Sequence, residues 1–460
     1  MKIAVMGTGH VGLVTSVALA SLGHRVVGTD VDGEKISLLK RGACPFYEPG
    51  LEEALRREMS AGRLAFTPEE SDALRDAEAI FICVGTPARS NGEANLVAME
   101  SSARAIARHA RDGVVVIEKS TVPAGTAERV RDTLARERSG FTFDVASNPE
   151  FLREGTALHD ALEPDRIVIG VESGRARDVL RRLYGPLTER GHLLIETDIA
   201  TAELAKHASN AFLALKISFA NALARVCERA GADITAVAGI MGTDPRIGRA
   251  FLNAGLGYGG YCFPKDLIAL ERLAARLGYE FPLLREVERL NDEAVQVAAA
   301  KIEEVLWNLE DKRIALLGLS FKPGTDDVRL SPALALAGRL LSAGARVIGF
   351  DPRALANAKQ ELPELEVAGD AYEAARDAHC LVLATEWDEF GALDLDALRE
   401  VMAYPIVVDA RNALDPARCA AAGFAYYPMG RPPVLPDPSS ASLAEGRREA
   451  LVPTPEELTR

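Results

Sequence analysis

A short glycine-rich segment brings a thiol, an amine and a carboxylate close together in the chain. It runs from Gly257 to Asp266 and reads Gly-Tyr-Gly-Gly-Tyr-Cys-Phe-Pro-Lys-Asp. Its glycines let the backbone approach a ligand closely, and a neighbouring cation would lower the pKa of the Cys262 thiol and make it a nucleophile. A tight turn around a buried cysteine is the structural alternative. Beside a nicotinamide, such a thiol suggests aldehyde oxidation, in which a thiohemiacetal loses a hydride and the resulting thioester is hydrolysed.

Two pairs of polar residues stand four positions apart, a spacing that places both members on one helix face. Lys206 and Asn210 form the first pair, within an otherwise apolar stripe. A cation there could stabilise an oxyanion, whereas a lysine that merely extends to water is the alternative. Glu150 and Glu154 form the second pair, for which a solvated helix face is the usual explanation.

A third pattern indicates a dinucleotide. Gly7, Gly9 and Gly12 stand between an apolar run and a helical pattern, and Asp30 ends the next apolar run. In this context the glycines permit a tight turn, and backbone N–H groups at the helix N-terminus bind a pyrophosphate. Asp30 would accept hydrogen bonds from the ribose 2′-hydroxyl and repel a 2′-phosphate. We therefore expect NAD rather than NADP; a Rossmann-like domain that has lost its cofactor is the alternative.

The elements that must position these residues are short apolar runs alternating with helical patterns, which is typical of a parallel sheet covered on both faces. The runs are Lys2–Gly7, Arg25–Asp30, Ala79–Val84 and Val114–Ile117, and the first helical pattern is His10–Leu22.

The same order recurs near the other end of the chain. Arg313–Gly318 and Ala345–Asp351 repeat the first two runs roughly 310–320 residues later, a period far too long for stacked repeats. The sequence therefore predicts an α/β fold with two Rossmann-like doubly wound domains. The second copy lacks the three-glycine pattern and has Phe321–Asp327 in its place, so we expect it to bind another ligand. Between the copies, Thr201–Ala230 predicts a helix about 45 Å long, suited to a connecting spine or a dimer contact.

The composition is that of an ordinary globular chain, with 48% hydrophobic and 26% charged residues among 460. A formal net charge of −14 argues against nucleic acid or an anionic membrane as a partner. We expect no signal peptide and no membrane span, which would need roughly 20 apolar residues. The six cysteines are scattered without metal-ligand spacing, so we expect reduced thiols, no metal and a cytoplasmic protein.

Several segments, taken together and in this order, resemble the UDP-glucose/GDP-mannose dehydrogenase family. They are Gly7–Gly12, Glu118–Pro123, Asn148–Gly155, Phe251–Gly255 and Gly257–Asp266. The resemblance covers residues 1–430 and implies that a long central helix joins the two Rossmann-like domains and forms a homodimer. It implies an NAD-binding domain (1–200), a central helical domain (201–300) and a UDP-sugar-binding domain (301–430); we expect residues 431–460 to be a disordered tail.

The resemblance implies a four-electron oxidation of a sugar C6 alcohol to an acid, which consumes two NAD and one water. The implied catalytic residues are Cys262 as nucleophile, Lys206 and Asn210 for oxyanions, Asp266 and Thr121 for a water that serves proton transfer, and Glu150 for thioester hydrolysis. The implied NAD-binding residues are Gly7, Gly9, Val11, Gly12, Asp30, Lys35, Thr86, Thr121, Glu154, Lys265 and Arg329. The implied sugar-nucleotide residues are Glu150, Phe151, Leu152, Glu154, Lys206, Asn210, Phe251, Leu252, Asn253, Ala254, Gly255, Gly259, Phe263, Lys322 and Arg411, with Arg246 from a second subunit.

The Phe-Pro-Lys-Asp stretch that begins at Phe263 favours UDP-glucose. The branch acting on GDP-mannose tends to have Leu in place of Phe263, and the branch acting on UDP-N-acetylhexosamines typically lacks the Lys-Asp pair. These sibling activities are the nearest alternatives. A single-hydride dehydrogenase of β-hydroxy acids, which has no use for a thiol, and a nucleotide-sugar sensor without turnover are the others. Tyr261 departs from the family, which usually has Ser before the nucleophile, and a bulky ring there could alter the sugar pocket.

Overall fold

The computed structural model describes residues 1–87, 89 and 91–436. The chain forms two compact units, each of which is described by itself. The first unit contains Met1–Ser218, Tyr258–Arg289 and Pro323–Arg329, and the second contains Phe219–Gly257, Leu290–Lys322 and the chain from Leu330.

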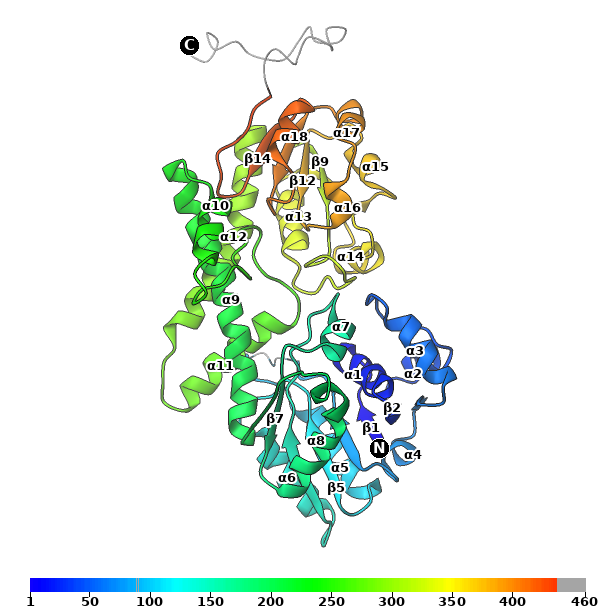
Figure 1. The fold of residues 1–460 in the computed structure, drawn as a ribbon. Helices are drawn as coiled ribbons and strands as arrows, with labels where there is room; N and C mark the ends of the chain where they lie inside the picture. Colours follow the sequence, from blue (N-terminus) through cyan, green and yellow to red (C-terminus); the bar gives the residue numbers. More distant parts are fainter. Residues whose placement is uncertain (88, 90, 437–460) are drawn as a thin grey trace, which may run out of the picture. The chain divides into compact units, whose positions relative to one another are not determined.

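The first unit is built on an eight-stranded sheet (Figure 1) with the strand order β3-β2-β1-β4-β5-β6-β7-β8. Neighbouring strands are parallel except β6 and β7, which pair antiparallel through Ala146 and Ser147. The strands are β1 (Lys2–Met6), β2 (Arg25–Thr29), β3 (Leu64–Thr67), β4 (Ala79–Ile82), β5 (Val114–Glu118), β6 (Phe143–Ser147), β7 (Ile167–Val171) and β8 (Leu194–Thr197).

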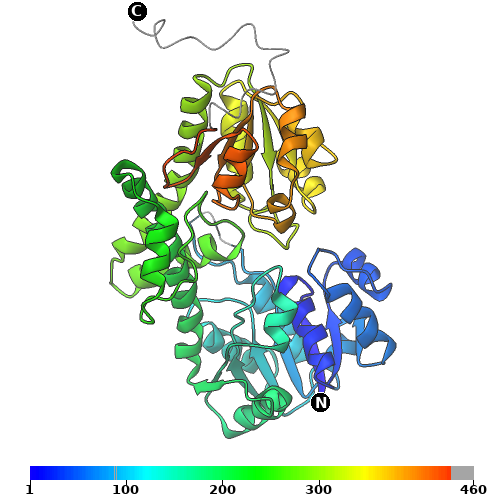
Figure 2. The same ribbon diagram turned by 45° about the horizontal axis from the view of Figure 1, so that its top comes forward.

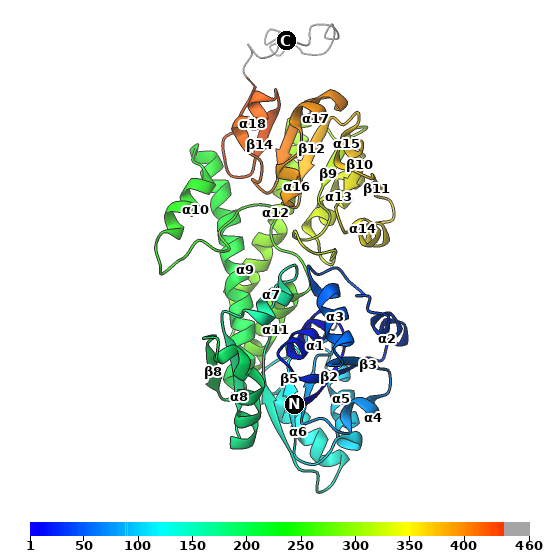
Figure 3. The same ribbon diagram turned by 45° about the vertical axis from the view of Figure 1, so that its right-hand side comes forward.

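Helices cover both faces of this sheet because alternate strand residues point to opposite sides. In β1, Ile3 and Val5 belong to one apolar core, and Ala4 and Met6 to the other. Figure 3 shows α1 and α7 on one side of the strands and α5 and α6 on the other. The helices are α1 (His10–Ser21), α2 (Gly33–Lys40), α3 (Leu51–Ser60), α4 (Glu70–Leu74), α5 (Val97–His109), α6 (Thr126–Glu137), α7 (Ala157–Leu162), α8 (Gly174–Thr188) and α11 (Cys262–Arg276).

The second unit has a six-stranded parallel sheet with the order β11-β10-β9-β12-β13-β14. This order repeats that of the first six strands in the other sheet, so the internal echo in the sequence corresponds to a repeated architecture. Its strands are β9 (Arg313–Leu317), β10 (Arg346–Phe350), β11 (Glu366–Val367), β12 (Cys380–Leu383), β13 (Ile406–Asp409) and β14 (Ala425–Pro428). Its helices are α10 (Ile234–Gly242), α13 (Pro332–Ser342), α14 (Leu355–Glu361), α15 (Ala371–Ala375), α16 (Asp388–Gly391), α17 (Leu395–Val401) and α18 (Pro416–Ala421).

Two long helices contribute residues to both units: α9 (Ile199–Ala230) and α12 (Pro282–Leu306). The expected helix over Thr201–Ala230 is thus one unbroken element (Figure 2) of 32 residues. Gly231, which has a φ of 69°, follows its last residue, as is typical of a helix C-terminus.

The expected tail needs a correction at its start. Val434 pairs with Tyr426 through two backbone hydrogen bonds of 2.9 Å, and Arg431 contacts Asp233 at 3.0 Å. Residues 431–436 are therefore held against the second unit, although their Pro-rich composition suggested disorder. The rest of the expected tail, 437–460, lies outside the described residues.

Across residues 1–87, 89 and 91–436, none of the helices is both long enough and apolar enough to cross a membrane. In the same part of the chain, no three His, Cys, Asp or Glu side chains are grouped so that they could hold a metal ion.

Candidate active site

The Gly7–Gly12 turn links β1 to α1 and leaves open space where a dinucleotide would lie. A Cβ atom on Gly12 would stand 1.9 Å from the carbonyl oxygen of Gly7, so a side chain cannot be accommodated there. A Cβ on Gly9 would meet nothing within 4 Å, and α1 begins after Gly9 without a side-chain cap. Uncapped N–H groups at an open helix N-terminus suit a pyrophosphate. The turn therefore fits NAD.

Asp30 follows β2 and lies against the same turn. Its carboxylate accepts hydrogen bonds from the Thr8 N–H (2.7 Å), the Thr8 hydroxyl (2.9 Å) and the Asp32 N–H (3.0 Å), and Lys35 lies 3.3 Å away. Burial alone would raise its pKa, but these donors hold the pKa of Asp30 below its usual value. The group is thus an ionised acceptor, the form required to bind ribose hydroxyls and to repel a 2′-phosphate.

Cys262 is the first residue of α11, and solvent reaches its side chain. The pKa of its thiol is nevertheless raised to about 12. Loss of hydration in the crowded surroundings is the main cause, and the carboxylates of Glu150 and Asp266 add to it more than Lys206 offsets. A neighbouring cation, Lys206, does lower this pKa as expected, but burial and a carboxylate beside the lysine outweigh its effect.

That carboxylate belongs to Glu150, which lies 2.9 Å from the Nζ atom of Lys206. The two side chains are 4% and 5% exposed, so this is a buried ion pair. Burial would lower the pKa of Lys206, but Glu150 and Asp266 raise it above its usual value, and the lysine is protonated. Glu150 also accepts a hydrogen bond of 2.6 Å from the Leu152 N–H. Lys206 is therefore buried at the site rather than extended to water.

Asp266 connects α11 to α9. One of its oxygens accepts a hydrogen bond of 2.6 Å from the Asn210 side-chain amide, and the other lies 2.7 Å from the Lys265 ammonium. Asp266 and Lys265 are both buried. The structure thus brings Cys262, Lys206, Asn210, Asp266 and Glu150 into one cluster within the first unit.

Thr121 lies in the loop after β5, which α9 also contacts. The Thr86 hydroxyl donates to the Thr121 carbonyl at 2.9 Å, and Nε2 of His207 lies 2.9 Å from the Val122 carbonyl. His207 neighbours Lys206 in sequence, so the loop contacts the turn of α9 that carries Lys206.

Arg329 and Glu154 form a second charged group in the first unit. Arg329 makes a close two-nitrogen contact with Asp327 and lies 3.6 Å from Glu154. Its guanidinium also stands 4.9 Å from the centre of the Tyr261 ring, and Lys265 lies 5.5 Å from the same ring. Tyr261, the residue that departs from the family pattern, therefore packs beside the cations that the resemblance assigns to NAD.

Several expected sugar-nucleotide residues lie together in the second unit. Asn221 accepts a 2.7 Å hydrogen bond from the Gly255 N–H, and a Cβ on Gly255 would stand 2.7 Å from the Ala410 carbonyl. Arg411 donates to the Ala384 carbonyl at 2.7 Å and to the Gly257 carbonyl at 3.2 Å. Arg246 instead forms an exposed two-nitrogen contact with Asp244. The segment 251–255 and Arg411 are thus neighbours, and Asn221 is a supporting residue that the sequence reasoning did not single out.

The other expected residues lie on these same elements. Val11 is in the first turn of α1, Lys35 is in α2, Phe151 and Leu152 follow Glu150, Phe263 follows Cys262 in α11, and Gly259, Phe251, Leu252, Asn253, Ala254 and Lys322 lie in loops.

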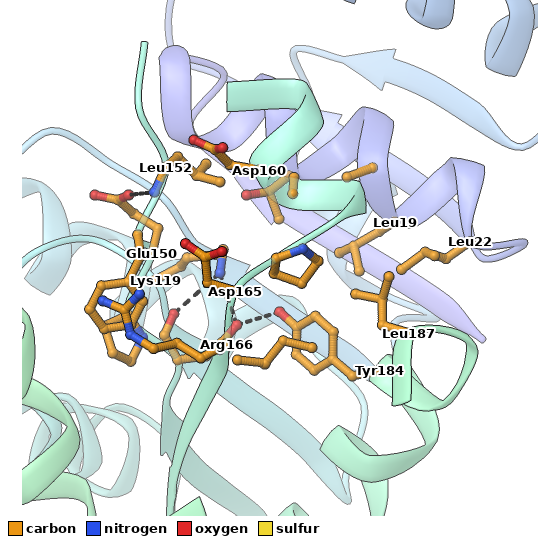
Figure 4. Close-up of a pocket in the computed structure, with 18 of the residues that line it drawn as sticks. Leu19, Leu22, Lys119, Glu150, Leu152, Asp160, Asp165, Arg166, Tyr184 and Leu187 are labelled. Atoms are coloured by element: carbon orange, nitrogen blue, oxygen red, sulfur yellow. Dashed lines mark hydrogen bonds between the residues drawn. The ribbon is translucent and has the colours of Figure 1, made fainter. Parts of the chain in front are cut away.

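A cavity of about 80 Å³ lies beside the loop that carries Glu150 (Figure 4). Lys119, Asn148 and Tyr184 line it, and all three are buried. Lys119 belongs to the Glu118–Pro123 segment, but the sequence assigns it no role, because its burial follows from the fold and not from its neighbours in the chain.

Comparison with known proteins agrees with this geometry. Three parts of the UDP-glucose/GDP-mannose dehydrogenase family match the chain: the NAD binding domain over residues 1–188, the central domain over 200–293 and the UDP binding domain over 315–416. This chain belongs to that family. The fold class and the family resemblance are confirmed, and the chain is an oxidoreductase that uses NAD.

Individual relatives are similar over nearly their whole length. The UDP-glucose 6-dehydrogenase YwqF of Bacillus subtilis strain 168 is 43% identical over 438 residues, covering 95% of this chain and 99% of that protein. The UDP-glucose 6-dehydrogenase of Rhizobium meliloti strain 1021 is 44% identical over 436 residues, with coverages of 94% and 100%. Among solved structures, a UDP-glucose dehydrogenase from the archaeon Pyrobaculum islandicum matches with a TM-score of 0.87 and 41% identity, covering 94% of this chain and 98% of that one.

Proposed function

We propose that this chain is a UDP-glucose 6-dehydrogenase, which oxidises the C6 alcohol of the sugar to a carboxylate in two successive steps. The observation that carries the proposal is the position of Cys262 at the start of α11. There the thiol is close enough to the buried Lys206–Glu150 pair for both charges to shift its pKa. A thiol serves an oxidation that passes through an aldehyde, and a single-hydride dehydrogenase has no need of one.

The β1–α1 turn and Asp30 would hold NAD, which would supply the hydride acceptor for both oxidations. In the first step, Lys206 and Asn210 stabilise the developing alkoxide. The hydroxyl proton passes to a water held by Asp266 and Thr121. The product of this step is an aldehyde, the group to which a thiol can add.

Because burial and Glu150 raise the pKa of the Cys262 thiol, the proton must leave the sulfur as Cys262 adds to the aldehyde. The new S–C bond forms while the thiol proton ends on the C6 oxygen, so the thiohemiacetal is neutral overall. Loss of a hydride from C6 and of the hydroxyl proton leaves a thioester.

Glu150 acts in the last step, the hydrolysis of the thioester. It accepts a proton from the attacking water, the C–S bond breaks, and the Cys262 sulfur leaves and recovers a proton. Lys206, which already contacts Glu150, stabilises the oxyanion of the tetrahedral intermediate.

NADH counting tests this sequence of steps. We expect two NADH, measured at 340 nm, for each UDP-glucose consumed; one NADH would refute the four-electron reaction. Cys262→Ser should lose carboxylate formation, and full retention of it would refute the nucleophile assignment. Faster turnover on GDP-mannose or a UDP-N-acetylhexosamine than on UDP-glucose would refute the substrate assignment.

A homodimer is part of the same proposal. Phe212, Phe219 and Val226 are spaced by seven residues along α9, and they are 62%, 49% and 60% exposed. Large apolar side chains aligned on one helix face are typical of an interface, so a second copy of α9 is their natural partner. The domain limits 1–200, 201–300 and 301–430, the contribution of Arg246 from a second subunit, and a cytoplasmic location remain predictions.

A further inference from the structure

The loop that carries Glu150 has a cavity along one side. Residues 148–156 connect β6 to α7 without regular helix or strand. On one side they line the cavity of about 80 Å³, together with side chains from α1, α7 and α8 (Figure 4). A cavity removes the dispersion contacts that otherwise immobilise a segment. Lys206 and the Leu152 N–H hold the Glu150 carboxylate itself, so the question is what holds the backbone that carries it.

Asn148 supplies that support through its own side chain. Its oxygen accepts hydrogen bonds from the Lys119 ammonium at 3.0 Å and from the Tyr184 hydroxyl, and its amide donates to the Val168 carbonyl at 2.8 Å. The Lys119 ammonium lies a further 3.4 Å from the Asn148 carbonyl oxygen. The Asn148 side chain, two residues before Glu150, is thus tied to the residue that follows β5, to β7 and to α8.

Lys119 is the charged member of this network. It is 8% exposed, and its pKa is lowered to about 8, first by burial and then by Lys206, while Cys83 and Glu150 act in the opposite direction. A buried ammonium is costly unless its hydrogen bonds are satisfied, so the chain tolerates Lys119 because Asn148 accepts from it twice.

We propose that Lys119 is a positioning residue for Glu150: by holding Asn148, it keeps the Glu150 carboxylate where thioester hydrolysis needs it. The inference deepens the proposed function and rests on it. Lys119 acts through Asn148 and does not contact the sugar. Its loss should therefore slow the last step and leave the two oxidations nearly unchanged.

The test compares Lys119→Met with Thr15→Val by rapid mixing with UDP-glucose and NAD. Met keeps the length of the side chain and removes the donor. Thr15 lines the same cavity, and its buried hydroxyl has no hydrogen-bond partner among the described residues, so Thr15→Val is a matched control. We expect Lys119→Met to release two NADH per active site in a fast phase and then to turn over about 10- to 100-fold more slowly than the unmodified protein. Mass spectrometry should find an acyl group on Cys262. Thr15→Val should behave as the unmodified protein.

Three outcomes would overturn the proposal. In the first, Lys119→Met turns over within twofold of the unmodified protein. In the second, Lys119→Met releases the first NADH slowly and accumulates no acyl-enzyme. In the third, Lys119→Met has a raised KM for UDP-glucose and an unchanged kcat. Tyr184→Phe removes one donor to Asn148 and keeps the ring, so it should show the same acyl-enzyme with a smaller loss of turnover. It decides the question if Lys119→Met does not fold. Failure of the proposed function is distinguishable, because the unmodified protein would then not yield two NADH per sugar.

Discussion

Replacement of Glu150 by Gln should lower the pKa of the Cys262 thiol. The side chain keeps its shape and loses its charge. Glu150 raises the pKa of Cys262, whereas Lys206 lowers it. The substitution removes the charge of Glu150 and also frees the charge of Lys206 from its partner, so both effects lower the thiol pKa. A charged neighbour shifts a pKa by about one to three. We therefore expect the thiol pKa to fall from about 12 to about 9–11.

Alkylation by iodoacetamide measures this change. At pH 8 a fall of one to three in the thiol pKa raises the thiolate fraction about 10- to 1,000-fold, while the intrinsic nucleophilicity of the thiolate decreases with a Brønsted coefficient of about 0.5. The net acceleration should be about 3- to 30-fold. Quantification of the peptide that contains Cys262 separates it from Cys44 and from the buried cysteines.

Glu154→Gln is the matched control for this experiment. Glu154 also raises the pKa of Cys262, but its effect is smaller than that of Glu150. It should accelerate alkylation less than Glu150→Gln. Glu150→Gln also leaves Lys206 buried and unpaired, which costs about 3–5 kcal/mol of stability, so its thermal midpoint should fall. A folded Glu150→Gln protein that is alkylated at the unmodified rate or more slowly would refute the electrostatic reasoning.

Other expected outcomes concern the cofactor, a buried carboxyl and the dimer. Asp30→Ala should reduce kcat/KM for NAD about 10- to 100-fold, as expected for the loss of a charged hydrogen-bond acceptor. It should also reduce the preference of the enzyme for NAD over NADP. Steady-state kinetics with both dinucleotides measure this preference, and an unchanged preference would contradict the prediction. Burial first, and then the neighbouring Glu203, raise the pKa of Glu118 well above its usual value of 4.5. The folded state thus holds a proton that the unfolded state loses, and stability decreases as the pH rises above 4.5. Glu118→Gln should therefore melt about 2–4 °C higher at pH 8, with the difference shrinking towards pH 4; scanning fluorimetry that found no pH-dependent difference would contradict it. Phe212→Asp combined with Phe219→Asp should give monomers in sedimentation experiments, and a persistent dimer would show that α9 is not the interface.

The sheets could be predicted because their strands are local and strongly apolar. Lys2–Gly7 and Arg25–Asp30 became β1 and β2, and the repeated runs near Arg313 and Ala345 became β9 and β10. The antiparallel pairing of β6 and β7 was not predicted, because the direction of a strand depends on the route of the connecting chain and not on its composition. The same reason explains residues 431–436, where backbone pairing with β14 overrides a Pro-rich composition.

The sequence by itself determined which chemical groups the chain carries and which stand close together along it. The three-glycine turn followed by Asp30, and the Cys262–Asp266 segment, are local patterns in which backbone geometry and spacing already restrict the chemistry. Only the tertiary structure decided which charges meet. Glu150 and Lys206 are far apart in the chain but 2.9 Å apart in space, and their pairing raises the lysine pKa while the carboxylate helps to raise that of the thiol. Packing between distant segments also buries Lys119, which lowers its pKa, and places it against Asn148, which bonds to β7 and α8 as well. Desolvation and the distance between charges set these properties, and both are determined by packing between segments distant in sequence.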